Sequence, residues 1–577
     1  MRTLSFTLTV VANTILCVTA AAQSTYWIDL DVEGAWESAA NWSHGVPAPA
    51  GTWIAYINNG GRAHVSVAGQ GCAWLQLGED SGESGAVRVS TGDLTITTGH
   101  VGCSGTGSIL QTDGDVWFRD LCVGKNPGGH GAYELTGGTL DIYSVEYVGL
   151  GGTGSFIQTG GTHSVGTRMD IACNPDLDSS YELGGGELIV AGENVGFQGQ
   201  ATFDQTGGTH TVNGNLTMGA FSLDTAYALH AGELEAEWEW IGSCGAAAFT
   251  QTGGTHTVLN NLTLGNANAL EYPNSRGTYL LQGGEVHVQG DLILANGSRD
   301  VLFIQADGTL TVDGAFYVGY WGAVNSDANA TYTIYGGTLD VNTLHIGRAG
   351  CYGYFYHLGP GAAVSVSGLL LFDETAEFYA LPGAKIHMTG AQFDIAGGVD
   401  PSSLSPGLRW LELIFEGGAG DIDTFEVAGQ DLGPTMFGFH ANGGNCALHA
   451  LTLGGADVGQ VQLVNNQEHH GTDEALYVNT LNVGPGSYLD LNGINLYYVQ
   501  GYVDPGATIV NGSPTFLLAG DYDGDGVVGP ADYQAMSGCF TGPAGGIEAG
   551  CSAFDFDTDH DVDLMDFAEF QVVYEGA

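Results

Sequence analysis

The sequence predicts an all-β chain, a right-handed parallel β-helix or solenoid, followed by a small α-helical module. Three observations carry this prediction: a glycine-anchored repeat, an alternation of apolar residues after each anchor, and two acidic segments near the C-terminus. The 577 residues include 95 glycines, and 64 acidic residues stand against 11 basic ones. Many turns and few helices are therefore expected.

The N-terminus has the pattern of a secretory signal peptide. Met1-Arg2 precedes an apolar run from Leu4 to Val18, which ends in small residues up to Ala22. We expect residues 1–22 to be removed on export. The sequence predicts no membrane span after that, because no later segment is apolar over eighteen residues. An extracellular or cell-surface protein is expected.

The charge of the chain argues against two classes of partner. The formal net charge is −53, and no Lys or Arg follows Arg409. Nucleic acid and anionic membranes are poor partners for such a chain, because phosphate binding needs clustered Lys and Arg. Outside the C-terminal loops, the simplest interpretation of the acidity is solubility.

Residues 23–80 are rich in tryptophan and precede the regular repeat, so we expect them to cap the solenoid. Such caps are needed because each coil buries its apolar face only against its neighbours. The segment around Trp27, Trp36 and Trp42 resembles the entry segment of large secreted bacterial β-solenoids, including autotransporter passenger regions. The resemblance implies an exported rod.

Residues 81–410 carry the repeat, and its period fits one coil of a parallel β-helix. Each coil is anchored on the second glycine of a Gly-Gly-like step, with gaps of 22 to 30 residues. The anchors are Gly92, Gly114, Gly138, Gly161, Gly186, Gly208, Gly232, Gly254, Gly284, Gly308 and Gly337. About a dozen coils at about 4.8 Å each would make a rod on the order of 55 Å long.

Side chains around each anchor indicate a strand with one buried face. Two and four residues after an anchor the side chain is apolar or histidine, as at Leu188 and Val190. Five residues before an anchor the side chain is aromatic in nine successive coils, and we expect these rings to form a column. They are Tyr133, Phe156, Tyr181, Phe203, Tyr227, Phe249, Tyr279, Phe303 and Tyr332. Residues 411–518 still alternate and form either further coils or a small β domain.

Three histidines, His163, His210 and His256, occupy equivalent positions on alternate coils. Neighbouring histidines would lie about 9.5 Å apart, whereas ligands of one zinc ion lie within roughly 4 Å of one another. A ladder of metal sites is therefore disfavoured. Each histidine is expected to pack between leucines of adjacent coils with one ring nitrogen hydrogen-bonded.

An enzyme remains the alternative, because parallel β-helices also carry polysaccharide lyases and hydrolases. Lyase chemistry needs grouped cations, and the Lys and Arg residues of the solenoid share no repeat position. No pair of carboxylates stands out for glycoside hydrolysis. Trp238 and Trp240 alternate with glutamates and are interpreted as core residues rather than as a sugar-stacking strip. We assign no catalytic residue.

Two acidic segments in residues 519–577 have the spacing of twelve-residue calcium loops. Carboxylates stand at loop positions 1, 3, 5 and 12, and position 7 supplies a carbonyl oxygen, which suits a hard cation such as Ca²⁺. The expected ligands are Asp521, Asp523, Asp525, Val527 and Asp532 in the first loop and Asp555, Asp557, Asp559, Asp561, Asp563 and Asp566 in the second. The like charges repel, so the loops should order when the metal binds.

This pair of loops, each closed by Asp, looks like a type I dockerin, a small EF-hand-like module. The resemblance covers about 57 of the 577 residues and implies Ca²⁺ as cofactor and a cohesin-like domain as partner. It also implies an extracellular polysaccharide as the alternative partner, because such modules are often fused to polysaccharide-degrading enzymes. Loop positions 10 and 11 contact the partner in that family, and here they are Pro530, Ala531, Leu564 and Met565.

Four further residues of the module bear on its calcium loops and its stability. Gly529, at position 9 of the first loop, removes a ligand and should weaken that site. His560 replaces the turn glycine of the second loop at a modest cost. Cys539 and Cys551 flank a Gly/Pro loop and are candidates for a disulfide bond, which an exported protein could keep.

Overall fold

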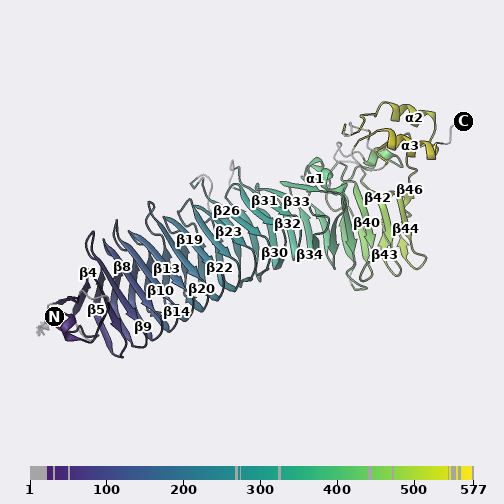
Figure 1. The fold of residues 1–577 in the computed structure, drawn as a ribbon. Coiled ribbons are helices and arrows are strands. Elements are labelled where there is room, and N and C mark those ends of the chain that lie inside the picture. The colour runs from purple at the N-terminus through teal and green to yellow at the C-terminus, as the bar shows by residue number, and fades with distance from the viewer. Residues whose placement is uncertain are drawn as a thin grey trace, which may run out of the picture.

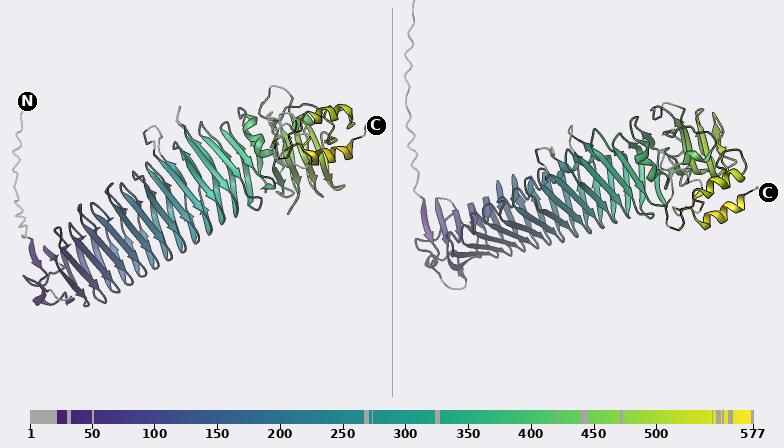
Figure 2. Two further views of the ribbon diagram at one scale, coloured as in Figure 1. Left: turned by 45° about the horizontal axis from the view of Figure 1, so that its top comes forward. Right: turned by 90° about the horizontal axis from the view of Figure 1, so that it is seen from above.

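The protein is a parallel β-solenoid, as the repeat predicts, and it has about 18 turns. The computed structural model describes residues 22–29, 33–49, 52–266, 271–272, 274–322, 327–420, 422–439, 445–470, 473–543, 545–546, 551, 554–556 and 561–574. The coils stack into a long rod, and two helices lie beside its C-terminal end (Figures 1 and 2). Apart from Ala22, the predicted signal peptide lies outside the described residues.

Two parallel sheets form the rod, and the smaller one ends at Ala380, so the described strands after that residue all belong to the larger sheet. The 15-stranded sheet contains β2 (Gly34–Ala35), β4 (Asn59–Val65), β6 (Ser84–Val89), β8 (Thr106–Gln111), β10 (His130–Leu135), β13 (Thr153–Gln158), β16 (Asp178–Leu183), β19 (Gln200–Gln205), β21 (Thr225–Leu229), β23 (Ala246–Gln251), β26 (Arg276–Leu281), β29 (Val301–Gln305), β31 (Asn329–Ile334), β33 (Tyr352–His357) and β35 (Ala376–Ala380).

The 31-stranded sheet contributes one long strand or two short strands to each coil. It contains β1 (Gln23–Tyr26), β3 (Trp53–Ile57), β5 (Gln70–Leu77), β7 (Leu94–Val101), β9 (Asp115–Val123), β11 (Thr139–Ile142), β12 (Val145–Val148), β14 (Thr162–Val165), β15 (Arg168–Ile171), β17 (Glu187–Val190), β18 (Glu193–Val195), β20 (Thr209–Met218), β22 (Glu233–Ile241), β24 (Thr255–Val258), β25 (Leu262–Asn266), β27 (Glu285–Val288), β28 (Leu292–Asn296), β30 (Thr309–Trp321), β32 (Thr338–Ile346), β34 (Ala363–Phe372), β36 (Ala384–Met388), β37 (Gln392–Ile395), β38 (Leu411–Phe415), β39 (Asp423–Glu426), β40 (Leu448–Leu453), β41 (Gln460–Val464), β42 (Ala475–Val483), β43 (Tyr488–Asp490), β44 (Asn495–Val503), β45 (Thr508–Val510) and β46 (Thr515–Phe516).

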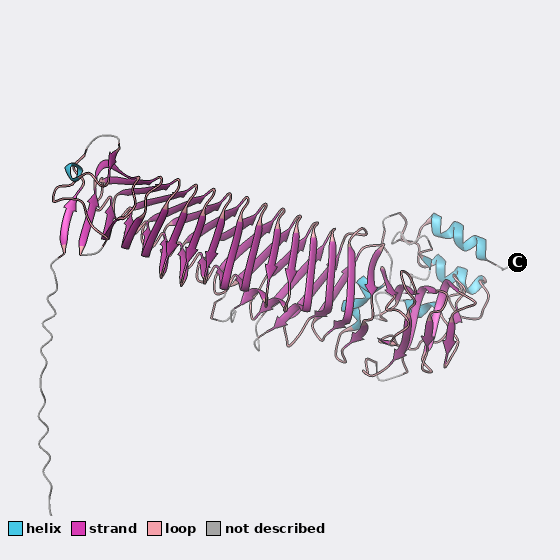
Figure 3. Cartoon of the chain, turned by 90° about the horizontal axis from the view of Figure 1, so that it is seen from below, coloured by secondary structure: helices cyan, strands magenta, loops and turns pink. Residues whose placement is uncertain are grey.

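Helices are few, as Figure 3 shows. The helices in the described part of the chain include the α-helices α1 (Pro401–Leu408), α2 (Pro530–Ser537) and α3 (Leu564–Val573) and the short 3-10 helices η1 (Ala39–Asn41) and η2 (Met436–Phe439). None of the helices in the described part of the chain is long and apolar enough to cross a membrane.

Both ends of the rod extend the coil ladder beyond the regular repeat. At the start, β1 pairs in parallel with β3, and β3 with β5. Trp42 packs edge to face against both Trp27 and Trp36, with ring centroids 5.0 Å apart in each pair. Strands β38 to β46 continue the 31-stranded sheet after β37. The solenoid therefore has more coils than the dozen expected from the anchors alone.

The expected aromatic column is present in the core from Tyr133 to Phe303, but the ninth expected ring, that of Tyr332, is tilted by 58° to the ring of Phe303 and leaves the parallel stack. Tyr181 stacks between Phe156 and Phe203, with ring centroids 4.7 and 4.9 Å away and planes within 5° of parallel. The parallel stack runs from Tyr133 to Phe303. All of these rings are buried. Each coil thus continues the column of its neighbours, and this fixes the register along the rod.

The anchor glycines hold the turns that bring consecutive coils together. Gly186 has φ of +84°, and a Cβ built on it would overlap the carbonyl oxygen of Gly161 in the preceding coil. We expect Gly186→Ala to lower the free energy of unfolding by more than about 1 kcal/mol, because alanine meets both the φ penalty and the overlap. Urea denaturation followed by tryptophan fluorescence measures this. Gly361→Ala, where φ is not positive and a Cβ meets nothing within 4 Å, is the control.

Each of the three repeat histidines packs in line with apolar side chains of adjacent coils, which are leucines on both sides of His163 and His210, but Leu234 and Val286 beside His256. His163 is in register with Leu140 and Leu188 of the adjacent coils, and it is fully buried. Its Nδ1 lies 2.9 Å from the Tyr181 hydroxyl, which in turn donates to Oε1 of Gln158 at 2.6 Å. Burial raises the pKa of Tyr181 well above its ordinary value.

The sequence analysis missed the second partner of each histidine. Nε2 of each ring faces a buried glutamate, at 2.9 Å for His163–Glu146, 2.9 Å for His210–Glu193 and 2.7 Å for His256–Glu239. A signal existed, since each glutamate precedes its histidine by 17 residues. A Glu–His–Tyr–Gln network therefore recurs on alternate coils.

The interpretation of Trp238 and Trp240 as core residues is wrong. On β22 the core side chains are Leu234, Ala236, Glu239 and Ile241, so the alternation changes parity between Ala236 and Glu239. This parity change turns both tryptophans outward. Trp238 is 36% exposed, and Trp240 is partly buried.

Candidate metal centre at the C-terminal end

The C-terminal module has its own small core, separate from that of the rod. Val528 and Met536 pack with Phe554, Val562 and Phe570 between α2 and α3. The chain has no Lys or Arg here, so oxygen atoms dominate the polar groups of the module.

Tyr522, at position 2 of the first loop, joins the module to the rod. Its ring lies 4.6 Å from that of Phe437 on η2 and stacks 5.2 Å from that of Phe554 in the module. The first loop therefore packs against η2, beside the C-terminal coils of the solenoid.

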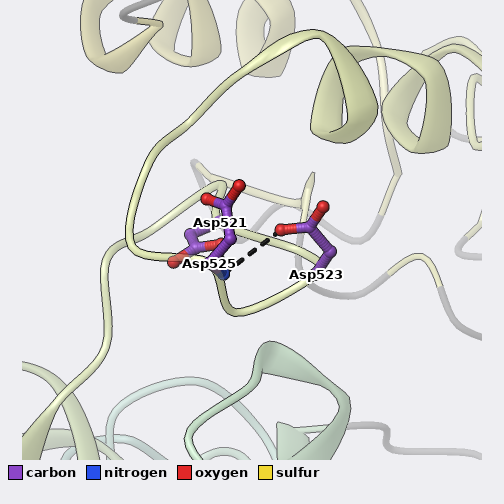
Figure 4. Close-up of side chains that lie close together, drawn as sticks. All are labelled: Asp521, Asp523 and Asp525. Atoms are coloured by element: carbon purple, nitrogen blue, oxygen red, sulfur yellow. Dashed lines mark hydrogen bonds between the residues drawn. The ribbon is translucent and has the colours of Figure 1, made fainter.

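In the first loop, three of the predicted ligands come together. Carboxylate oxygens of Asp521, Asp523 and Asp525 lie within 4.8 Å of one another, and Figure 4 shows the three side chains close together. Asp521 is the buried member and accepts backbone N–H groups from Gly524 and Gly526, both at 2.8 Å. Burial raises the pKa of the Asp521 carboxyl, and the nearby Asp532 contributes to the same shift.

Asp532 closes the first loop and starts α2. Its carboxylate accepts the N–H of Tyr522 at 2.6 Å and the N–H of Gly529 at 2.7 Å, and the side chain is buried. As the third residue of α2 it also satisfies a free donor at the helix start. One side chain therefore fixes both ends of the loop.

The second loop repeats this arrangement. Asp566 accepts the N–H of Phe556 at 2.6 Å and the N–H of Asp563 at 2.8 Å, at the third position of α3. Carboxylate oxygens of Asp561, Asp563 and Asp566 lie within 4.8 Å of one another. Asp555 is also described, whereas the predicted ligands Asp557 and Asp559, like His560, lie outside the described residues.

The donor set fits a hard divalent cation. Converging carboxylates in both loops supply only oxygen, and Ca²⁺ takes six to eight oxygen ligands. Val527 is the predicted carbonyl ligand of the first loop, and its N–H donates to Asp525 at 2.9 Å, which orients the chain at position 7. The residues present therefore suit Ca²⁺ better than a thiolate-binding metal.

The predicted partner-binding residues lie at the starts of the two helices. Pro530 and Ala531 begin α2, Leu564 and Met565 begin α3, and all four are exposed. Sequence reasoning missed an apolar hollow of about 190 Å³ on the same module. It is lined by Tyr533, Phe567, Phe570, Gln571 and Tyr574.

Cys539 and Cys551 form a disulfide bond between the two loops. It closes the segment that follows α2 and joins the core of the module. Such a covalent link limits how far the two halves of the module separate when the loops open.

No protein-family model, no curated protein and no solved structure matches the chain. The function therefore has to be argued from the geometry of the chain itself.

Proposed function

We propose that the protein is an exported structural or adhesive rod, and that its C-terminal module binds two Ca²⁺ ions and then docks onto a cohesin-like domain. The single observation that carries the proposal is the repeated geometry of Asp532 and Asp566. Each carboxylate ties the start of an acidic loop to the start of a helix, with matching bonds of 2.6 Å to position 2 of the loop.

Bound calcium would supply the positive charge that lets these carboxylates converge. The residues that would hold it in the first loop are Asp521, Asp523, Asp525 and Asp532, and Asp555, Asp561 and Asp566 would contribute in the second. Without a cation, the repulsion between the carboxylates opposes the closed loop. The exposed starts of α2 and α3 then depend on calcium for their spacing.

The shape of the rod supports a structural role. Its coils share one continuous core from Trp27 to Leu496, so the solenoid is one stiff body rather than a string of domains. Such a body places whatever its outer faces carry at a fixed distance from the docking module.

Calorimetric titration of the mature chain with Ca²⁺ tests the proposal, alongside helical circular dichroism and limited proteolysis. We expect two ions per chain, a rise in helical signal, and protection of residues 519–577 that EDTA reverses. Mg²⁺ at the same concentration is the control and should give less protection, because it prefers a smaller, octahedral site. Proteolysis that is equal in calcium and in EDTA would contradict the proposal.

A further inference from the structure

A groove runs along the outside of the rod, parallel to its axis, where the two strands of each coil meet. One hollow of about 650 Å³ extends from Trp117 and Tyr143 to Ile189, and a second of about 300 Å³ extends from Arg168 to Thr217. Thr167 and Ala191 line both hollows. The two hollows are therefore one continuous feature, which we call the corner groove.

Aromatic rings stand at both ends of the corner groove. At the N-terminal end, Trp117 and Tyr143 lie with ring centroids 6.5 Å apart, and Tyr143 is 70% exposed. At the other end, Trp238 and Trp240 pair in register with Asn215 and Thr217, which line the second hollow. Solvent-facing rings at the ends of a groove offer flat apolar faces to a ligand.

Between the rings, the wall of the corner groove is polar and rigidly held. The Arg168 guanidinium binds Oδ2 of Asp170 through Nε at 2.9 Å and Nη2 at 2.8 Å. Oδ1 of Asp170, a buried carboxylate, accepts from Asn194 at 2.6 Å. Because Asp170 balances Arg168, this part of the groove presents fixed hydrogen-bonding groups without an excess of positive charge.

We infer that the corner groove binds an extended, uncharged polysaccharide. A sugar ring has an apolar face that stacks on an aromatic ring and a rim of hydroxyls that needs donors and acceptors, and the groove supplies these in alternation. From β9 to β22 the register passes five strand spacings, which gives roughly 24 Å at about 4.8 Å each, enough for several sugar units.

Charge decides between neutral and acidic polymers. The chain has a formal net charge of −53, which repels polyanions such as uronic acid chains. Arg168 lines the second hollow and is already paired with Asp170, and among the described residues no other Lys or Arg lines either hollow. An uncharged chain meets no such repulsion. This inference does not rest on the calcium module, because the groove lies in β9 to β22.

Affinity electrophoresis of the mature chain tests the inference. The gels would contain mixed-linkage glucan, xyloglucan, galactomannan or amylose, with polygalacturonate and alginate as acidic probes. We expect retardation by at least one neutral polymer and by neither acid. Trp117→Ala/Trp238→Ala should weaken that binding about tenfold or more, because it removes an aromatic face at each end.

Two variants make the result specific to the corner groove. Ala191→Leu fills the junction of the two hollows from the solvent side and should also abolish retardation. Trp321→Ala, at a tryptophan that is 43% exposed and lies on β30, beyond the coils of the corner groove, should leave it unchanged. Retardation by no neutral polymer, retardation by the acids, or binding that survives Ala191→Leu would overturn the inference. EDTA should change nothing, which separates this result from failure of the calcium proposal.

Discussion

Replacing Asp532 and Asp566 together with alanine is expected to reduce calcium uptake from two ions per chain to none. Each carboxylate stands at residue 12 of its loop, where a calcium ligand is expected, and each accepts two backbone N–H groups. The alanine variant loses the metal and also leaves those donors without their partner, which costs about 1–3 kcal/mol for each buried donor. We expect residues 519–577 to be cleaved at the same rate in calcium and in EDTA.

Single variants and a matched control sharpen this test. Asp532→Ala alone should leave one ion per chain in calorimetry, because the second loop keeps its own closing carboxylate. Asp504→Ala removes an acidic residue of the rod that lies outside both loops and should bind two ions like the unmodified chain. If Asp532→Ala/Asp566→Ala still takes up two ions, the assignment of the loops is wrong.

Replacing Glu193 with leucine is expected to lower the free energy of unfolding of the solenoid by about 3–5 kcal/mol. The change leaves His210 facing apolar side chains in a fully buried place, with Nε2 deprived of its partner at 2.9 Å. His210→Leu alone should lower the free energy of unfolding by a similar amount, because it leaves the buried Glu193 carboxylate without its histidine partner. Urea denaturation followed by tryptophan fluorescence measures both.

The double variant Glu193→Leu/His210→Leu should recover most of this loss. Neighbouring coils show why, since Leu188 and Leu216 already occupy the same two core columns as His210 and Glu193. Tyr133 also donates to Gln111, although Val116 occupies the histidine's repeat position in the preceding coil. A double-mutant cycle with additive losses would contradict the coupling.

An exposed histidine–aspartate pair serves as the comparison for the buried His210–Glu193 pair. His287 lies 2.9 Å from Asp313, with side chains 40% and 54% exposed. An exposed pair contributes on the order of 0–1 kcal/mol. His287→Leu should therefore change the unfolding midpoint far less than His210→Leu does.

The repeat was predictable because one coil constrains the next. A ring five residues before each anchor has to meet the ring of the neighbouring coil, so the column from Tyr133 to Phe303 followed from spacing alone. The same logic correctly predicted leucines on both sides of His163 and His210, whereas His256 lies between Leu234 and Val286. The spacing of the acidic residues likewise predicted that Asp521, Asp523 and Asp525 lie close together, as they do.

The orientation of side chains at the corners of the coils could not be predicted from the repeat. The alternation in β22 changes parity after Ala236, so Glu239 turns inward while Trp238 turns outward. Extending the inward–outward alternation unchanged through this corner therefore gave the wrong prediction that both tryptophans lie in the core. The Glu–His pairs were missed for a related reason, because each pair joins strands of different coils rather than neighbours in one strand.

The seat of Tyr522 between Phe437 and Phe554 has a mechanical consequence. If the module binds calcium and docks as proposed, force applied at the N-terminal end of the solenoid would reach the docked module partly through these three rings. Tyr522 also donates its N–H to Asp532, so closure of the acidic loop would stiffen this joint and opening of the loop would loosen it. The tilt of the rod relative to its point of attachment would then depend on the calcium concentration of the surrounding medium.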